Sequence, residues 1–243
     1  MEQRSIGGLN CFVADALPAG QDPDVVFVVC HGFGAPGTDL VPLAGELLRL
    51  QPGLASRVRF VFPAALLSMD EMGLPGGRAW WPLNVMQLQQ AIAAGEFRSL
   101  RTSIPPGLTE ARAALTEVVR ELRQDAGKKG FRLVLGGFSQ GAMLSTDVAL
   151  RLETPPDALV VLSGTMLCET EWEALAASRG NLAVLQSHGR QDPVLPFEAA
   201  EWLRDMFTAA GMAVEFLPFE GGHTIPANVL QQTGQLLVQV AES

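Results

Sequence analysis

Two hydrophobic patterns alternate along most of the chain. Short apolar runs rich in valine, leucine and phenylalanine predict buried strands, whereas apolar residues that recur every three or four positions predict amphipathic helices. Such an alternation predicts an α/β domain, in which helices cover both faces of a mainly parallel central sheet. The predicted strands are residues 25–30, 58–62, 132–136, 158–162, 182–187 and 213–219, with a weaker one at 9–14, and the predicted helices are residues 39–50, 109–126, 140–152, 197–210 and 227–240.

One long stretch, residues 64–107, interrupts this alternation. It is rich in proline and glycine, contains the pair Trp80 and Trp81, and shows a short helical pattern only near residues 85–94. A connection of this length inside a compact domain is usually functional. We therefore predict a single domain over residues 1–243 with a lid-like, substrate-binding insertion at 64–107; a surface insertion without a role is the alternative.

The composition excludes several classes of protein. An apolar fraction of 48% and a charged fraction of 18% over 243 residues are typical of an ordered globular protein. The formal net charge of −9 argues against nucleic acid or an anionic membrane surface as a partner. Residues 1–20 do not resemble a signal peptide and there is no run of 18 apolar residues, so we expect a cytoplasmic protein without stable membrane insertion.

The three cysteines, Cys11, Cys30 and Cys168, are odd in number and widely spaced. This pattern argues against both a disulfide framework and a zinc site, and we expect no bound metal. Because Cys30 lies inside a predicted strand, we expect it to be a buried, unreactive thiol.

A candidate nucleophile, Ser139, lies in the pattern GxSxG between a predicted strand and a predicted helix. A sharp turn at this place strains the serine backbone and exposes its hydroxyl above the sheet edge. Glycines two residues before and after it, Gly137 and Gly141, remove side chains that would collide with the neighbouring strand and helix. We predict that Ser139 is a nucleophile, with a glycine-rich packing turn as the alternative.

A serine hydroxyl needs a histidine to accept its proton and a carboxylate to orient that histidine. Of the three histidines, His223 follows the last predicted strand, and flanking glycines let its loop fold back toward Ser139. We predict His223 as the base. His188, at the end of an earlier strand, is predicted to be a structural turn residue, and His31 lies far upstream.

The predicted acid is Asp192, in a loop after the strand at 182–187 that two prolines stiffen. A rigid loop suits a carboxylate that must hold one imidazole tautomer. Glu169 and Glu171 are rival acids, because they follow the strand at 158–162. Asp147 falls seven residues into the helix after Ser139, where we expect a solvated or helix-packing role.

Acyl transfer also needs preorganised donors for the oxyanion of the tetrahedral intermediate. One predicted donor is the backbone N–H of Gln140, directly after the nucleophile. The other is the N–H of Phe33, with Gly34 second, in the glycine-rich loop that follows the strand at 25–30. That loop lacks the GK[ST] ending and the GxGxxG spacing of phosphate-binding loops, and a purely structural turn remains the alternative.

The order serine, acid, histidine is that of the α/β-hydrolase scaffold. The segments HGFG at 31–34, GGFSQGA at 136–142, HGRQDPVLP at 188–196 and GHTIP at 222–226 resemble the phospholipase/carboxylesterase family of α/β-hydrolases, which includes acyl-protein thioesterases. The resemblance covers most of the chain. It implies a Ser139/Asp192/His223 triad, Phe33 and Gln140 amides as oxyanion donors, and no cofactor.

Residues 78–81, RAWW, look like the aromatic segment that this family places beside its acyl site. Two departures from the family pattern lie here: Pro82 stands where an acidic residue is common, and the stretch from Trp81 to the helix at 109 is longer than in compact members. The acyl preference is therefore not carried over. The predicted pocket residues are Trp80, Trp81, Leu83 and Met86, some of which are expected to belong to the core instead.

The sequence thus predicts a serine carboxylesterase that acts on a small-molecule ester, a thioester or a lysophospholipid through an acyl-enzyme intermediate. A cofactor-free lyase or perhydrolase with the same triad is an alternative, and so is a non-catalytic binding module, which usually needs a damaged triad. The oligomeric state stays open, with a homodimer as one option.

Overall fold

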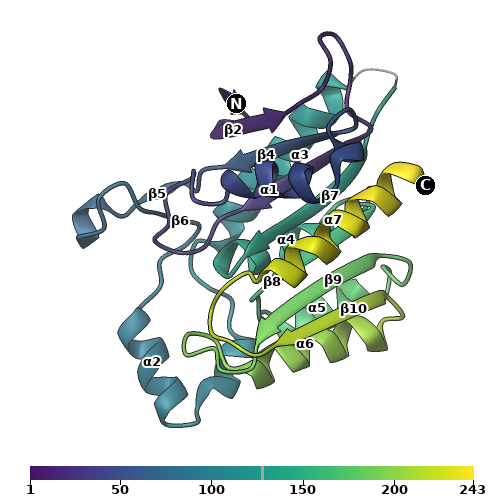
Figure 1. Cartoon of the computed structure of the whole chain (residues 1–243). Helices are drawn as coiled ribbons and strands as arrows, with labels where there is room; N and C mark the ends of the chain where they lie inside the picture. Colours follow the sequence, from purple (N-terminus) through teal and green to yellow (C-terminus); the bar gives the residue numbers. More distant parts are fainter. Residues whose placement is uncertain (127–128) are drawn as a thin grey trace.

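The centre of the protein is an eight-stranded sheet with the strand order β1-β2-β4-β3-β7-β8-β9-β10 (Figure 1). The computed structural model describes residues 1–126 and 129–243. The strands of this sheet are β1 (Glu2–Ile6), β2 (Leu9–Asp15), β3 (Val25–Cys30), β4 (Val58–Pro63), β7 (Arg132–Phe138), β8 (Ala158–Leu162), β9 (Ala183–Gly189) and β10 (Ala213–Phe219).

The sheet is parallel from β4 to β10 and antiparallel only at one edge, where β2 pairs with both β1 and β4. In a parallel sheet, every strand ends at the same edge, so the loops after β3, β7, β9 and β10 gather there. The predicted catalytic residues and oxyanion donors lie at or just after the ends of these four strands.

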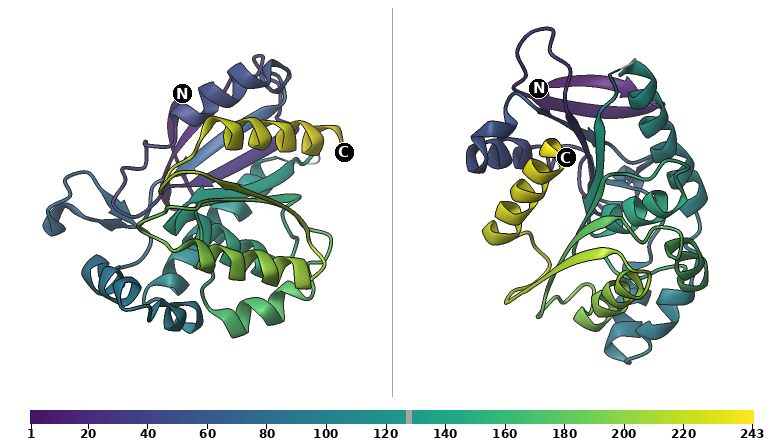
Figure 2. Two further views of the ribbon diagram at one scale, coloured as in Figure 1. Left: turned by 60° about the horizontal axis from the view of Figure 1, so that its bottom comes forward. Right: turned by 90° about the vertical axis from the view of Figure 1, so that its right-hand side faces the viewer.

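Helices cover both faces of the sheet, as predicted. The helices α1 (Pro42–Leu50) and α7 (Ala227–Glu242) pack together on one face, and α3 (Leu108–Asp125), α4 (Gln140–Arg151), α5 (Glu169–Ala176) and α6 (Phe197–Ala209) cover the other (Figure 2). Strand β3 shows why both faces need cover. Its alternate residues belong to opposite cores, with Val26 and Val28 facing α3 and α4, and Val25 and Phe27 facing α1 and α7.

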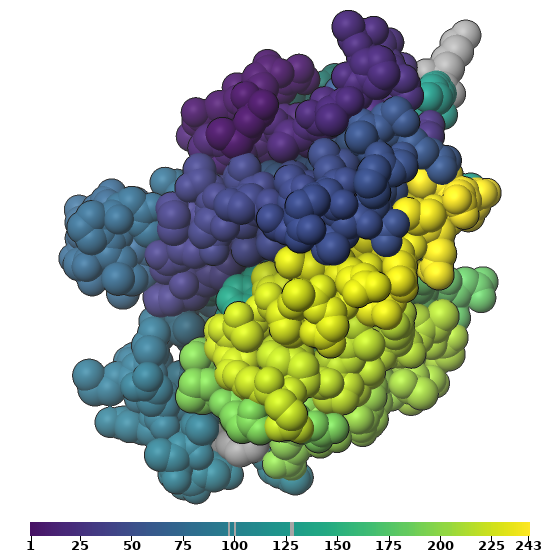
Figure 3. Space-filling view, in the orientation of Figure 1, coloured from purple at the N-terminus to yellow at the C-terminus, as the bar shows by residue number. Residues whose placement is uncertain are grey.

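The stretch 64–107 adds the remaining elements, apart from the short turn η1 (Pro52–Leu54). A two-stranded hairpin of β5 (Leu67–Ser68) and β6 (Arg78–Ala79) encloses the turn η2 (Asp70–Met72), and α2 (Val85–Ala93) and η3 (Phe97–Thr102) follow. The hairpin and the α2 region form two lobes at one side of the molecule (Figure 3). The Asn84 side chain caps α2 by accepting a hydrogen bond from the N–H of Gln87 at 3.0 Å.

Every predicted strand and helix is present, with ends shifted by three residues or fewer. The predictions missed β1, the β5–β6 hairpin and α5. Four of the five β1 residues are exposed, so this edge strand lacks the apolar alternation that marks a strand. Within the described part of the chain, no helix combines the length and the apolar character needed to cross a membrane.

Candidate active site

Ser139 lies on a strained turn between β7 and α4. Its backbone has φ 55° and ψ −119°, a conformation that non-glycine residues rarely adopt. Its N–H donates to the carbonyl of Leu162 on β8 at 2.9 Å, which holds the turn against the sheet. A Cβ at Gly137 would lie 2.5 Å from the Gly141 backbone, and one at Gly141 would lie 2.1 Å from the carbonyl oxygen of Cys30. Both glycines are therefore required by the close approach of strand and helix.

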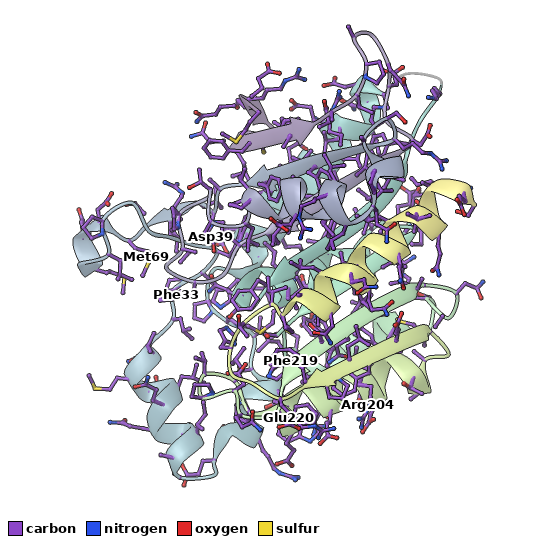
Figure 4. The ribbon with its side chains drawn as sticks, viewed as in Figure 1. Phe33, Asp39, Met69, Arg204, Phe219 and Glu220 are labelled. Atoms are coloured by element: carbon purple, nitrogen blue, oxygen red, sulfur yellow. The ribbon has the colours of Figure 1, made fainter. Side chains whose placement is uncertain are left out.

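His223 pairs with the predicted acid. It lies in the loop after β10, whose last residue, Phe219, is labelled together with Glu220 in Figure 4. Its Nδ1 is 2.7 Å from Oδ2 of Asp192. Because an ionised carboxylate only accepts hydrogen bonds, Nδ1 carries the proton and Nε2 is left free to accept another. The ring of Phe138, next to Ser139, packs against the imidazole with ring centroids 4.6 Å apart.

The Asp192 carboxylate is fully buried and receives four hydrogen bonds. Oδ1 accepts from the N–H groups of Val194 at 2.8 Å and Leu195 at 2.9 Å, and Oδ2 accepts from His223 and, at 3.3 Å, from Nε2 of His188. Burial alone would raise the pKa of Asp192, but the hydrogen bonds from His188, His223 and Leu195 outweigh it and hold that pKa well below its usual range. Asp192 is therefore an anion at neutral pH.

The contact with His188 corrects a sequence expectation. His188 was expected to be a turn residue, but it is the penultimate residue of β9, its side chain is fully buried, and it contacts the acid directly. One feature of the sequence could have indicated this contact: His188 lies four residues before Asp192 at the end of a strand, where a turn brings the two side chains together.

The rival acids have other partners. Glu169 pairs with Arg101 and Glu171 with Arg151. Asp147, expected to be solvated or helix-packing, is fully buried within α4 and bound to arginines and a tryptophan. Among these acidic residues, Asp192 alone contacts His223 in the described part of the chain.

Ser139 and His223 line one cavity of about 500 Å³. In the described part of the chain, no hydrogen bond joins the Ser139 and His223 side chains. What the two residues share is the wall of this cavity. The remaining wall is mostly apolar, and a large part of it comes from the stretch 64–107. The cavity is lined, among others, by Trp81, Pro82, Leu83, Val85, Leu88, Ile104, Pro105, Pro106, Met143, Met166, Leu167, Val194, Leu195 and Trp202.

The structure separates the four predicted pocket residues. Trp81 and Leu83 line the cavity, whereas Trp80 and Met86 do not. Met86 is 69% exposed on the outer side of α2, whose Val85 and Leu88 face the cavity instead. Periodicity alone did not reveal which side of this short helix faces inward. The prediction also missed the wall formed by Met143 and by the loop after β8, because only the fold brings these residues to the serine.

Within the described residues, the two backbone amides predicted as oxyanion donors are unpaired at the cavity. The N–H of Phe33, in the loop after β3 (Figure 4), and the N–H of Gln140, at the start of α4, have no hydrogen-bond partner within the described chain, and both residues line the cavity. The second choice, Gly34, is wrong, because its N–H donates to the carbonyl of Arg78 at 2.9 Å. Of Phe33 and Gly34, only Phe33 has an N–H without a partner among the described residues.

His31 anchors the same loop. Its Nε2 accepts from the N–H of Ala65 at 3.0 Å, so its Nδ1 carries the proton and donates to the carbonyl of Gly32 at 2.8 Å. Burial lowers the pKa of His31 and favours this neutral form. The histidine therefore fixes the backbone next to Phe33.

The Gln140 side chain joins the serine turn to the aromatic segment. Its Oε1 accepts from the N–H of Trp80 at 2.8 Å, and its Nε2 donates to the carbonyl of Trp81 at 2.9 Å. The indole of Trp80, 1% exposed, donates to the carbonyl of His31 at 2.9 Å. Trp80 thus links the aromatic segment to the serine turn and to the loop after β3, and it does not line the cavity. No pattern along the chain indicates this role of Trp80.

The described residues contain no group of three or more histidine, cysteine or acidic side chains arranged to hold a metal ion. All three cysteines are free and buried, as expected for Cys30, and burial raises the pKa of the Cys30 thiol to about 12, which disfavours its thiolate.

A mainly parallel sheet, a serine on a strained strand-to-helix turn, and an acid and a histidine after later strands define an α/β-hydrolase. The profile of the family described as Phospholipase/Carboxylesterase matches residues 16–240. The chain belongs to this family, and it is a carboxylic ester hydrolase of the serine hydrolase class.

Relatives are similar over most of their length. Acyl-protein thioesterase 1 of Eremothecium gossypii is 26% identical over 190 residues, which cover 78% of this chain and 75% of the relative. Among solved structures, that of esterase PE8 has a TM-score of 0.77 and 26% identity and covers 96% of this chain and 99% of its own. That of Zea mays acyl-protein thioesterase 2, with a TM-score of 0.68, 20% identity and coverage of 95% and 98%, supports the fold alone.

Proposed function

We propose that this protein hydrolyses carboxylic esters or thioesters through an acyl-enzyme intermediate on Ser139, with His223 as general base and acid and Asp192 as the orienting carboxylate. The observation that carries the proposal is the 2.7 Å contact between His223 Nδ1 and Asp192 Oδ2, beside a strained Ser139 on the same cavity. This contact leaves Nε2 of His223 unprotonated and able to accept the serine proton.

The reaction proceeds in two halves. Oγ of Ser139 attacks the carbonyl carbon while Nε2 of His223 takes its proton, and Asp192 stabilises the resulting imidazolium. The N–H groups of Phe33 and Gln140 stabilise the oxyanion, and removing one such donor typically lowers the rate about 10²- to 10³-fold. His223 then gives its proton to the leaving alcohol or thiol. In the second half it deprotonates a water, which attacks the acyl carbon and releases the acid and Ser139.

The cavity supports an acyl chain as the part of the substrate held beside Ser139. Its volume of about 500 Å³ and its apolar wall fit an aliphatic chain better than a charged group. Because residues 81–85 and 101–106 form much of that wall, we include in the proposal that the stretch 64–107 is a substrate-binding lid. The names of the relatives add acyl-protein thioesters to the candidate substrates, beside simple esters and lysophospholipids.

The test compares turnover of p-nitrophenyl esters, from acetate to laurate, by the wild type and by Ser139→Ala. We expect at least a 10³-fold loss in kcat in the variant, because the oxyanion donors alone do not supply a nucleophile. An unchanged rate in Ser139→Ala would end the assignment.

Two further measurements separate the alternative functions. A fluorophosphonate probe modifies Ser139 only if the serine is activated, so a non-catalytic binding module would stay unlabelled. Product analysis with water as the sole co-substrate distinguishes a hydrolase, which releases the free acid, from a lyase or perhydrolase.

A further inference from the structure

His188 occupies a buried position directly behind the predicted acid. Its side chain has no exposed surface, and its Nε2 lies 2.9 Å from the carbonyl oxygen of Leu195 and 3.3 Å from Oδ2 of Asp192. Both oxygens can only accept, so Nε2 must carry a proton and share it between them in a three-centre hydrogen bond. Nδ1 is buried and has no partner among the described residues.

The four donors divide evenly between the two oxygens of Asp192. The N–H groups of Val194 and Leu195 hold Oδ1, which fixes one end of the carboxylate. The two oxygens turn together about the Cβ–Cγ bond, so a donor on either oxygen opposes the rotation that would move Oδ2 away from His223. His188 is the second donor on Oδ2, and it is a buried residue of β9, a strand that is paired on both sides, so it restrains this rotation.

We infer that His188 is a positioning residue for the hydrolytic reaction, which keeps Oδ2 of Asp192 directed at Nδ1 of His223 by donating its Nε2–H to that oxygen. The inference rests on the proposed roles of Asp192 and His223. His188 itself does not line the cavity, so it acts through the acid and not on the substrate. The two imidazoles on one oxygen thus differ in function: His223 exchanges a proton with the substrate, and His188 holds the acceptor still.

The experiment compares two polar variants of similar size. In His188→Gln, the terminal amide reaches about as far as Nε2 and keeps a donor for Asp192. In His188→Asn, the amide ends near the place of Nδ1 and leaves Asp192 without that donor. We expect kcat for p-nitrophenyl butyrate to fall about 10- to 100-fold in His188→Asn with KM unchanged, and most of kcat to return in His188→Gln.

A spectroscopic readout tests the same geometry without turnover. The proton between His223 Nδ1 and Asp192 gives a far-downfield ¹H NMR resonance when the hydrogen bond is short and ordered. We expect this resonance in the wild type and in His188→Gln, and its loss or a marked upfield shift in His188→Asn. Equal kcat values and equal resonances in His188→Asn and the wild type would overturn the inference.

Gln186 supplies a matched control, because it is fully buried two residues earlier on β9 and its Nε2 donates to the carbonyl of Ala200 at 2.8 Å. It therefore faces the same side of the sheet, and none of its hydrogen bonds goes to Asp192. Gln186→Leu should lower Tm but leave kcat and the downfield proton unchanged. A fall in kcat equal to that of His188→Asn would assign the effect to general loss of stability and overturn the inference.

The failure of this inference is distinguishable from a failure of the proposed function. Full activity in Ser139→Ala would refute the function while the NMR comparison still reports on the acid. Conversely, Ser139-dependent turnover that His188→Asn leaves intact would refute the inference alone.

Discussion

Two regions of the molecule each contain a carboxylate without exposed surface, and they differ in what surrounds it. Asp147, within α4, binds Nε of Arg112 from α3, Nε of Arg151 at 3.2 Å and the indole N–H of Trp172 from α5 at 2.8 Å. Asp192, in the loop after β9, binds two imidazoles and two backbone N–H groups.

The partners decide what each carboxylate can do. An arginine is charged at every relevant pH, so Asp147 belongs to a permanently neutralised network that joins three helices. An imidazole that is protonated on Nδ1 alone carries no charge, so Asp192 keeps a negative charge that is available to stabilise an imidazolium when one forms. Burial therefore marks both residues, but only a titratable partner on the cavity suits one of them to catalysis.

The largest expected effect is the loss of kcat when Asp192, the carboxylate beside the cavity, is replaced. Asp192→Asn replaces the acceptor toward His223 with an amide N–H, which favours the tautomer that carries its proton on Nε2. We expect kcat to fall about 10³- to 10⁴-fold, because that tautomer cannot accept the Ser139 proton. Steady-state kinetics with p-nitrophenyl butyrate measure the loss, and a kcat within tenfold of the wild type would contradict the assignment of the acid.

The next largest effect is a loss of stability when Asp147, the carboxylate within α4, is replaced. Asp147→Asn leaves Arg112 without its counter-charge and Arg151 with Glu171 alone, and breaking a buried ion pair in this way costs about 3–5 kcal/mol. Both arginine side chains are partly exposed, at 21% and 25%, so we expect the lower end, about 3 kcal/mol. Urea denaturation measures the loss.

The control for this variant is its own catalytic rate at a temperature where it is folded. We expect kcat to equal that of the wild type, because Asp147 does not contact Ser139 or His223. A selective loss of kcat in a fully folded Asp147→Asn protein would show that the two regions are coupled.

The smallest expected effect is the pH dependence of the stability that ionised Asp192 contributes. Hydrogen bonds hold the pKa of folded Asp192 below its unfolded value of about 3.9, so the ionised form stabilises the folded state above that pH. The stabilisation is lost as the pH falls through the lower, folded pKa. We therefore expect the difference in free energy of unfolding between the wild type and Asp192→Asn to shrink below about pH 4. A difference that stays constant between pH 6 and pH 2.5 would contradict the depressed pKa.

Much of the fold was readable from the sequence. Strands β3 and β8 are buried on both faces, so they appear as unbroken apolar runs, and the helices between the strands keep a regular apolar spacing. The sequence also singled out Ser139, because a strained turn demands glycines at two fixed neighbouring positions. The exposed edge strand β1 was not predicted, because its residues do not alternate between apolar and polar.

The candidate site was readable only in part. Spacing after strands led to Asp192 and His223, because parallel strands deliver their loops to one edge. Spacing did not show that His188 lies behind the acid, that the Gln140 side chain fastens Trp80 and Trp81, or that the Gly34 amide is already bonded.

The order of residues along the chain thus determined most of the sheet, most of the helices and the residue types at the carboxyl ends of the strands. Burial and backbone strain act locally, so they leave a periodic pattern or a motif in the sequence. Tertiary structure alone decided which polar groups share hydrogen bonds and which side of α2 faces the cavity. Such pairings join residues from separate elements, and their geometry depends on distances of a few ångströms that no spacing along the chain encodes.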